Sequence, residues 1–462
     1  MYVHLHVTDV PLSSLYMPTN VRHADTKRTQ EREGLQRGYG NVVAIIGLGY
    51  VGLPLALLAQ ERGYDVRGYD IDKKKVDKLK RRVAEFLPEE ESKMLQESDL
   101  SVSTDESILD GVDIYVVCVP TPVHGNRLPD LRPLKSACQA IGRHMKKDTL
   151  VIIESTISPG VCENVALPEL EKASGLKGGT DFSFAHCPER INPGDNEWNV
   201  RTIPRVIGGL DPKSLARSVR FYESITDAPL RAMESIKEAE AVKMVENAFR
   251  DINIAFVNEL AMSFGSAGID ITNVIEGAAT KPFGFVPHSP GCGVGGHCIP
   301  VDPYYLIRYG RENGFEHRFL VTARKINSGM PRYTVKLLDE ALKERSKSFS
   351  EVTIALLGLS YKRDVPDTRE SPALVIRREL LRNKANVRVF DPFVPMQNSA
   401  ASLAEALEGA DAAVIATDHT AFQELMPEDF KKHGVEIVID GRNCLPKHAF
   451  LAQGLTYRGI GR

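Results

Sequence analysis

A cysteine in a glycine-rich segment is the residue of this chain best suited to covalent chemistry. Cys298 stands in the run Gly-Cys-Gly-Val-Gly-Gly-His-Cys-Ile-Pro-Val-Asp-Pro, residues 291–303. Glycines leave the backbone bare, so a substrate can approach the thiol closely. Asp302, four residues later, could orient water or tune the thiol. The pattern favours an enzyme that forms a covalent intermediate, and the alternative is a buried structural cysteine in a glycine loop.

A second glycine motif, near the start of the chain, predicts a dinucleotide site. It follows an apolar run at 41–46 and opens a helical stretch, so its glycines can make the tight turn, admit a pyrophosphate and pack helix on strand. An acid that ends the next strand can bind ribose hydroxyls and repels a 2′-phosphate, which favours NAD over NADP. The alternative is a plain turn beside a solvated aspartate. The predicted cofactor residues of this segment are Gly47, Gly49, Tyr50, Val51, Gly52 and Asp70.

Two short polar strings also end predicted strands. They are Val-Pro-Thr-Pro at 119–122 and Glu-Ser-Thr at 154–156. Ligands of open α/β sheets bind at the carboxyl ends of the strands. Thr121 and Thr156 could therefore bind the cofactor, although such threonines also cap helices and turns.

A long helical stretch carries polar residues at helical spacing. Lys243, Asn247 and Arg250 are four and three residues apart and share one helix face, which either lines a site or is solvated. Glu189 and Arg190 lie in a proline-bracketed loop that could be a surface turn.

Another segment suggests a second nucleotide-type ligand. Gly358, Lys362 and their neighbours follow a predicted strand, although the Gly-Lys-Ser/Thr ending of a phosphate-binding P-loop is absent.

The order of predicted elements defines the fold class. Strand-like apolar runs alternate with helical segments before residue 230 and again after Pro331, which is typical of doubly wound sheets. Residues 236–268 have almost no helix breakers and predict one helix of about 30 residues, long for a globular protein. We expect an α/β fold with two Rossmann-like, doubly wound parallel sheets joined by a long central helix. The predicted parts are an N-terminal extension (1–39), an NAD-binding domain (40–230), a central helical domain that contains Cys298 (231–330) and a C-terminal α/β domain (331–462).

Composition excludes several classes of function. The 462 residues, 42% of them hydrophobic, suffice for two or three domains. A net charge of -3 gives no reason to expect nucleic acid or an anionic membrane as partner, and we find no apolar run of membrane-spanning length. The seven scattered cysteines show no metal-ligand spacing, so we expect no metal and a reducing, cytoplasmic setting.

Together the motifs resemble the UDP-glucose/GDP-mannose dehydrogenase family, in the family's order, over about residues 41–462. Besides the strings above, the resemblance rests on Pro-Glu-Arg at 188–190, Gly-Gly-His-Cys at 295–298, and Lys362 with Arg369. It implies oxidation of a sugar C6 alcohol to a carboxylate with two NAD. It also implies that Cys298 is the catalytic cysteine of the central domain and that the C-terminal domain (331–462) is UDP-sugar-binding.

The resemblance also implies roles for the catalytic residues. Cys298 would capture an aldehyde as a thiohemiacetal, and a second oxidation would give a thioester that water hydrolyses. Lys243 would act as general acid/base and, with Asn247, support the oxyanion. Asp302 and Glu189 would orient water or relay protons.

Binding residues are implied in the same way. Lys362 would contact the nucleotide-sugar, Arg369 would reach the NAD, and Lys75 would assist Asp70 at the ribose. Guanidinium groups suit phosphates. The implied substrate-binding residues are Arg190, Ile191, Lys243, Asn247, Arg250, Gly291 and Lys362.

Details of the resemblance favour one branch of the family. Residues 188–190 and 302–305 look like the N-acetylhexosamine enzymes; the UDP-glucose branch has Phe at Arg190, a second acid at Pro193 and Lys at Val301. Residues 280–285, Thr-Lys-Pro-Phe-Gly-Phe, resemble the UDP-N-acetylglucosamine enzymes, and the His-Pro-Arg of the UDP-N-acetylmannosamine enzymes is absent. We therefore expect a UDP-N-acetylglucosamine 6-dehydrogenase, with the UDP-N-acetylmannosamine, UDP-GalNAc and UDP-glucose activities as alternatives.

Two other hypotheses compete with this one. A catalytically inactive nucleotide-sugar-binding protein would not need Cys298, Lys243 and Asn247. A two-electron alcohol dehydrogenase would need neither Cys298 nor a second sheet domain. The length of the central helix further predicts a homodimer or higher homo-oligomer built on it. From the family we expect a role in polysaccharide biosynthesis.

Overall fold

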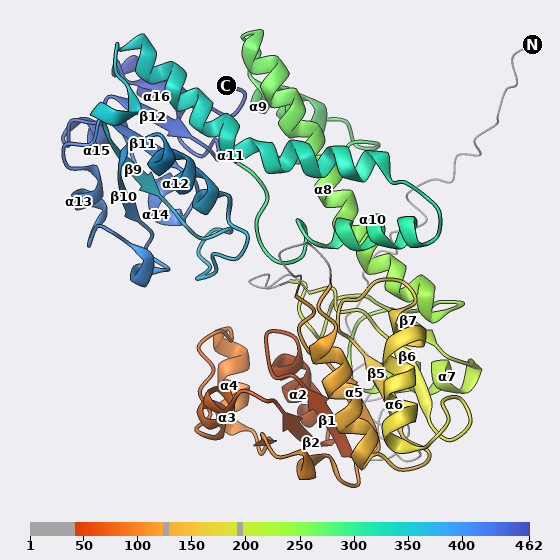
Figure 1. The fold of residues 1–462 in the computed structure, drawn as a ribbon. Helices are drawn as coiled ribbons and strands as arrows, with labels where there is room; N and C mark the ends of the chain where they lie inside the picture. The colour runs from red at the N-terminus through yellow and green to blue at the C-terminus, as the bar shows by residue number, and fades with distance from the viewer. Residues whose placement is uncertain (1–41, 123–128, 192–196) are drawn as a thin grey trace, which may run out of the picture.

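The structure is a computed structural model that describes residues 42–122, 129–191 and 197–462. The expected extension at 1–39 and the departure at Pro193 lie outside these ranges. Two α/β bodies stand at opposite ends of the molecule, and the long helix α8 runs between them (Figure 1). The predicted fold class is confirmed.

The N-terminal body is built on an eight-stranded sheet. Its order, β3-β2-β1-β4-β5-β6-β7-β8, contains the 3-2-1-4-5-6 order of dinucleotide-binding folds. Among the strand pairings of the described residues, only β6–β7 is antiparallel, which departs from the wholly parallel sheet that we expected. In the described part of the β6–β7 connection there is no crossover helix, and parallel neighbours need one. The strands are β1 (Val42–Ile46), β2 (Asp65–Tyr69), β3 (Ser101–Ser103), β4 (Ile114–Val117), β5 (Leu150–Ile153), β6 (Ser183–His186), β7 (Arg205–Gly209) and β8 (Leu230–Ala232).

Helices cover both faces of this sheet. The strands are apolar throughout because both faces are buried: Val43 and Ile45 belong to one core, Ala44 and Ile46 to the other. The helices are α2 (Gly52–Glu61), α3 (Lys73–Lys80), α4 (Glu89–Glu97), α5 (Arg132–His144), a π turn (Cys162–Ala166), α6 (Leu167–Ser174) and α7 (Pro212–Ile225).

The central region is helical. Helix α8 (Ile236–Ser266) has 31 residues, as the sequence predicts, and begins at a capping box in which Ser235 and Glu238 satisfy each other's backbone amides. It is followed by α9 (Ile271–Ala279), α10 (Asp302–Glu312) and α11 (Arg318–Glu344). Pro331, our expected domain boundary, lies inside α11, so one helix links the central region to the second sheet.

The C-terminal body holds a five-stranded parallel sheet in the order β10-β9-β11-β12-β13, the 2-1-3-4-5 arrangement of doubly wound folds. Its strands are β9 (Thr353–Leu357), β10 (Asn386–Phe390), β11 (Ala412–Ile415), β12 (Ile437–Asp440) and β13 (Thr456–Gly459). Its helices are α12 (Pro372–Arg382), α13 (Leu403–Leu407), α14 (Thr420–Gln423), α15 (Pro427–Lys431) and α16 (Lys447–Ala452). In the described ranges, no helix of the molecule is long and apolar enough to cross a membrane.

Candidate active site

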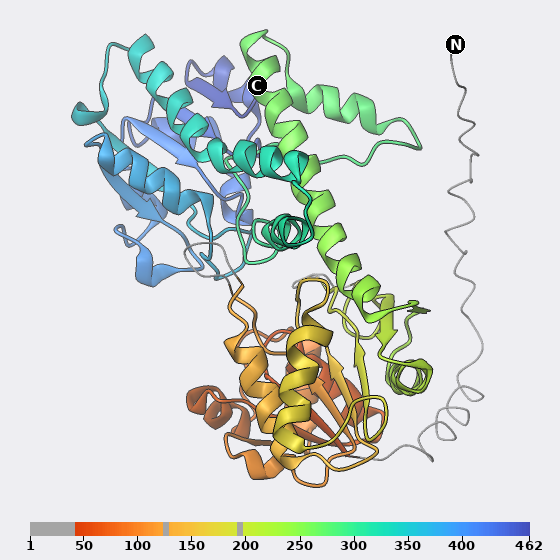
Figure 2. The same cartoon turned by 45° about the vertical axis from the view of Figure 1, so that its right-hand side comes forward.

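The segment that carries Cys298 is bonded to the C-terminal body before it enters α10. The Cys292 amide donates to the Gly441 carbonyl at 2.8 Å, and the Gly291 amide donates to Asn258 Oδ1 of α8 at 2.9 Å. Gly291, predicted as a substrate contact, thus lies where α8 meets the second sheet. The segment links the two bodies, which face each other across it (Figure 2).

The side chain of Tyr361 explains why Gly295 and Gly296, shortly before Cys298, are both glycines. A Cβ on Gly295 would lie 2.6 Å from a Tyr361 side-chain atom, and one on Gly296 would lie 2.8 Å from the ring. The Gly296 amide also donates to the Arg369 carbonyl at 2.9 Å. Only glycine lets the Tyr361 ring pack here. The loop after β9 therefore sets the position of Cys298.

Cys298 itself is partly buried at the N-terminal end of α10, where its carbonyl accepts the Asp302 amide at 2.9 Å. Burial, with a smaller contribution from the Asp302 carboxylate, raises the pKa of the thiol to about 12, and Lys243 opposes this rise. The thiol needs a base nearby before it can act as a nucleophile.

Asp302 is one candidate base. Asn247 of α8 donates to Asp302 Oδ2 at 2.5 Å, and the carboxyl is only 2% exposed. Burial raises its pKa to about 7, against the hydrogen bond from Asn247 and the charge of Lys243. Helices α8 and α10 thus present an amide and an acid to each other in the vicinity of the thiol.

Glu189 is the second candidate base, in the segment after β6. Its Oε2 lies 3.9 Å from Lys243 Nζ, and its Oε1 accepts the Ile191 amide. Burial raises the pKa of Glu189 to about 7, against the charge of Lys243. Carboxyls that titrate near neutrality are suited to general acid–base work. The five predicted catalytic residues are thus brought together from three parts of the chain.

The predicted arginines are placed differently. Both ends of the Arg190 guanidinium are engaged, by Glu246 of α8 and by the Pro204 carbonyl at 2.8 Å. Arg250 is exposed, whereas Lys243 and Asn247 are buried, so the predicted polar face divides between site and surface.

In the C-terminal body, the Arg369 guanidinium forms a fork with Asp367, with 2.9–3.0 Å from Nε to the two carboxylate oxygens. Its side chain is half exposed. Lys362, half-buried, lies in the same loop after β9.

The glycine turn after β1 fits a dinucleotide. Gly47 has φ +93°, and a Cβ on it would lie 2.7 Å from the Cys118 carbonyl; a Cβ on Gly52 would lie 2.0 Å from the Gly47 carbonyl. A Cβ on Gly49 would meet nothing within 4 Å, so this backbone is open to a pyrophosphate. Tyr50 is exposed, and Val51 caps α2.

Asp70 is held firmly at this turn. Its carboxylate accepts the Leu48 amide at 2.9 Å, the Asp72 amide at 2.9 Å and Lys75 Nζ at 2.7 Å. The residues predicted to bind the adenosine ribose thus contact each other, and an acid at this position disfavours a 2′-phosphate.

The two predicted threonines also meet. Thr121 Oγ1 donates to the Thr156 carbonyl at 2.6 Å, across neighbouring strands β4 and β5. The Tyr305 hydroxyl of α10 donates to the Thr121 carbonyl at 2.8 Å. Tyr305 therefore ties the helix that follows Cys298 to the NAD-binding edge, a contact that the sequence did not reveal.

The second sheet repeats the turn of the first. Gly358 has φ +90° and donates to the Phe390 carbonyl at 2.9 Å, and the Leu359 amide donates to Asp391 Oδ2 at 2.6 Å. Gly47, Leu48 and Asp70 make the same pattern. Asp391 was missed, although an acid ending the strand after a glycine turn was a usable signal. The repeat fits the predicted second nucleotide-type ligand.

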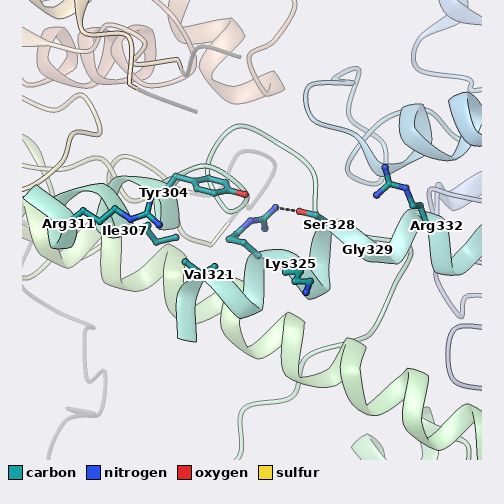
Figure 3. A pocket seen from close by; sticks show the side chains of 9 residues that line it. Tyr304, Ile307, Arg311, Val321, Lys325, Ser328, Gly329 and Arg332 are labelled. Atoms are coloured by element: carbon teal, nitrogen blue, oxygen red, sulfur yellow. Dashed lines mark hydrogen bonds between the residues drawn. The ribbon is translucent and has the colours of Figure 1, made fainter. Parts of the chain in front are cut away.

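A cavity of about 540 Å³ lies away from this site, between α10 and α11 (Figure 3). Three of its cations are paired: Arg324 with Asp251 at 2.5 Å, Arg311 with Glu316 at 3.0 Å, and Arg332 with Glu379 at 3.3 Å. The predicted site residues all lie in the described ranges, and none of them lines this cavity. Its lining residues are Tyr304, Ile307, Arg311, Val321, Arg324, Lys325, Ser328, Gly329 and Arg332.

Three consecutive segments match one protein family, the UDP-glucose/GDP-mannose dehydrogenases. Residues 41–226 match its NAD binding domain, residues 237–329 its central domain and residues 355–447 its UDP binding domain.

Individual relatives match over nearly their whole length. The chain is 40% identical to UDP-N-acetyl-D-mannosamine dehydrogenase of Pyrococcus horikoshii over 426 residues, 91% of this chain and 99% of that protein. It is 37% identical to UDP-N-acetyl-D-glucosamine 6-dehydrogenase of Pseudomonas aeruginosa over 402 residues, 85% of this chain and 94% of that protein. A solved structure of the UDP-D-ManNAc dehydrogenase of Pyrococcus horikoshii aligns with a TM-score of 0.86 at 39% identity, covering 91% of this chain and 99% of the other.

Proposed function

We propose that this chain, a member of the UDP-glucose/GDP-mannose dehydrogenase family, oxidises the C6 alcohol of UDP-N-acetyl-D-glucosamine to the carboxylate. The family makes it an NAD-dependent UDP-sugar dehydrogenase. The observation that carries the reaction is the meeting of one thiol with two titratable carboxyls, an amide and an ammonium. The Asn247–Asp302 contact of 2.5 Å and the Lys243–Glu189 contact of 3.9 Å define that group.

The covalent route follows from these residues. NAD, when bound, accepts the hydride in each of the two oxidations. The Cys298 sulfur adds to the C6 aldehyde while Lys243 and Asn247 stabilise the oxyanion, and oxidation of this thiohemiacetal gives a thioester. Water then adds to the thioester carbon, and the carboxylate leaves as the thiol is restored. The added oxygen comes from that water.

Proton transfer in this route falls to the two carboxyls. The Cys298 thiol, whose pKa is raised to about 12, must give its proton to a base. Asp302 and Glu189, whose pKa values burial raises to about 7, are present in both protonation states near neutrality. One carboxyl takes the thiol proton, and the other takes a proton of the attacking water. Lys243 donates a proton to the oxyanion that forms when the sulfur adds, and it accepts the hydroxyl proton of the alcohol and of the thiohemiacetal as each hydride leaves.

The identity of the sugar rests on the segment at 280–285, which resembles that of the UDP-N-acetylglucosamine enzymes. Its Lys281 Nζ lies over the exposed Phe283 ring, 4.8 Å from the centroid. UDP-N-acetyl-D-mannosamine is the second candidate, because the Pyrococcus horikoshii relative bears that activity in its name at 40% identity.

The stoichiometry of NADH tests the function and the sugar together. Purified protein is incubated with excess NAD and a limiting amount of UDP-GlcNAc, UDP-ManNAc, UDP-GalNAc or UDP-glucose, and NADH is counted per sugar. We expect two NADH per sugar and the highest kcat/KM with UDP-GlcNAc. One NADH per sugar would mean a two-electron dehydrogenase, and none with any sugar would mean a binding protein.

We also propose that two copies of this chain associate through α8. Val245, Phe249 and Phe256 are 57%, 50% and 52% exposed, and their spacing places them on one face of the helix. An apolar face of this kind is typical of a protein–protein contact. The same helix carries Lys243 and Asn247, so the association would also steady the site.

A further inference from the structure

A buried ion pair lies next to the candidate active site, and the reaction just described does not use it. Arg205 Nη1, at the start of β7, donates to Glu154 Oε1 at 2.8 Å, and both side chains are buried. The Tyr222 hydroxyl of α7 donates to the same carboxylate oxygen at 2.5 Å, and its ring lies 4.8 Å beneath the Arg205 guanidinium. Glu154 opens the Glu-Ser-Thr string, of which only Thr156 was assigned a role.

The pair is bonded to the segment that carries Glu189. The Cys187 amide donates to the Ile153 carbonyl at 3.0 Å, and the Glu189 amide donates to the Glu154 carbonyl at 3.3 Å. The chain after β6 thus continues alongside the residue whose side chain forms the pair. The backbone carbonyl of Glu154 thus helps to hold the backbone amide of Glu189.

Within the described residues, three neighbouring elements present charged groups to Glu189. Helix α8 supplies Lys243 and Glu246, the end of β5 supplies Glu154, and the start of β7 supplies Arg205. The thiols of Cys298 and Cys118 also interact with it, and its neighbour Arg190 is bound to Glu246. Glu154 raises the pKa of Glu189 and Arg205 lowers it, so the two charges of the pair act on this carboxyl in opposite directions.

We propose that the buried ion pair of Glu154 and Arg205, completed by Tyr222, is a positioning group for Glu189 that fixes its backbone and presents no net charge to its carboxyl. A buried pair of this kind supports a defined local geometry. The inference rests on the proposed role of Glu189 as a proton acceptor.

The test is the pH dependence of kcat for variants of the pair. Glu154→Gln leaves the Arg205 cation unpaired, because guanidinium stays charged at every relevant pH. That cation favours the ionised form of Glu189. The acidic limb of the profile, which is the range where kcat falls as the pH is lowered, should therefore move to lower pH by about one unit. The double variant Glu154→Gln/Arg205→Met removes both charges, so its limb should return to the wild-type pH while kcat stays lowered about tenfold or more. KM for the UDP-sugar should change little in both.

Controls separate the inference from the proposed function. Asp302 should still give an acidic limb in Glu189→Gln, so the steepness of the limb is compared. If Glu189→Gln leaves the limb as steep as in the wild type, the proposed role of Glu189 fails; if it makes the limb shallower while Glu154→Gln leaves the limb in place, only the present inference is overturned. Asp411→Asn, which removes the ion pair with Lys347 at 2.7 Å in the C-terminal body, should change neither kcat nor the limb. Should Glu154→Gln fail to accumulate as folded protein, the double variant decides, and a wild-type kcat in it would refute the positioning role.

Discussion

Two acids and one thiol define the chemistry at the scale of residues. Burial raises the pKa of both Glu189 and Asp302 to about 7, although Lys243 opposes the rise at each. Carboxyls that are exposed to water have pKa values of about 4, so at neutral pH they are ionised and are only weak bases. The enclosed site makes them stronger bases, which the Cys298 thiol requires because burial raises its pKa as well.

The pH dependence of kcat should show these carboxyls. Both are protonated below their pKa values of about 7, and a proton acceptor must be ionised, so activity should rise with pH and be lost as the pH falls through 7. Below pH 7, kcat should fall about tenfold per pH unit if one carboxyl must be ionised, and about a hundredfold per pH unit if both must be. Steady-state rates between pH 5 and 9 measure this. A profile flat from pH 5 to 8 would contradict the assignment.

Asn247→Ala should affect the same profile and the rate. It removes the donor that lies 2.5 Å from Asp302 Oδ2 and lowers the pKa of that acid. The acidic limb should therefore move to higher pH, and kcat should fall about 10²–10³-fold through loss of oxyanion support.

The control is Asn383→Ala at the C-terminal end of α12, where the exposed side chain donates to the Glu379 carbonyl at 2.9 Å in the same way as a local helix cap. It should keep the wild-type profile, and equal effects in the two variants would refute the special role of Asn247.

Sequence patterns located most of these residues, because glycines, a cysteine and strand-ending acids mark a site without reference to tertiary contacts. They failed where the partner is distant in the chain. The sequence around Arg190 does not predict its contact with Glu246, and the sequence around Gly296 does not predict the packing of Tyr361 against it. Arg250 shares a helical period with Asn247, yet its side chain is exposed because position in the period alone does not show which residues a neighbouring element covers.

At the scale of elements, the segment before α10 is the feature that couples the two bodies. Its glycines accept the Tyr361 ring, and its amides bond to carbonyls of the second sheet domain. Periodicity predicted α8 well because no breaker interrupts it. It did not predict the antiparallel β7, since strand direction depends on the connection and leaves no mark in the strand itself.

Gly296→Ala should disturb this coupling. Gly296 has φ +87°, and the added methyl would lie 2.8 Å from the Tyr361 ring. Displacement of Cys298 by about 1 Å should lower kcat about 10²-fold. Kinetics with saturating NAD and UDP-sugar measure the effect.

Gly454→Ala is the matched control, because Gly454 has a similar φ of +79° but open space around a Cβ. It should cost about 1–2 kcal/mol of stability through backbone strain and leave kcat unchanged. Similar kcat values for the two variants would show that Tyr361 does not set the loop.

At the scale of the whole molecule, two glycine turns of the same design face a central helical region. Asp70 and Asp391 each hold the backbone of a turn at the carboxyl edge of a sheet. Composition and strand alternation predicted this plan. They could not predict that α11 would run unbroken through Pro331, because the loss of one backbone amide is tolerated when the helix is packed along its length.

Association through α8 makes a prediction at this scale. Phe249→Glu with Phe256→Glu places charges on the proposed contact, where both rings are half exposed. We expect the mass from light scattering to fall from that of a dimer or larger oligomer to about that of one chain, 51.1 kDa. Met396→Glu, at a 96% exposed position of the C-terminal body, should leave the mass unchanged. A wild-type protein that elutes as a monomer would contradict the proposal.

The sugar held on sulfur is the step on which the account depends, and mass spectrometry observes it directly. Glu189→Gln protein, in which hydrolysis should be slow, is mixed with NAD and UDP-GlcNAc, quenched in acid within one turnover and digested. The peptide that contains Cys298 should gain the mass of the UDP-sugar acyl group, and Cys298→Ser protein should show no adduct. A sample that has formed NADH while its Cys298 peptide stays unmodified would contradict the covalent route.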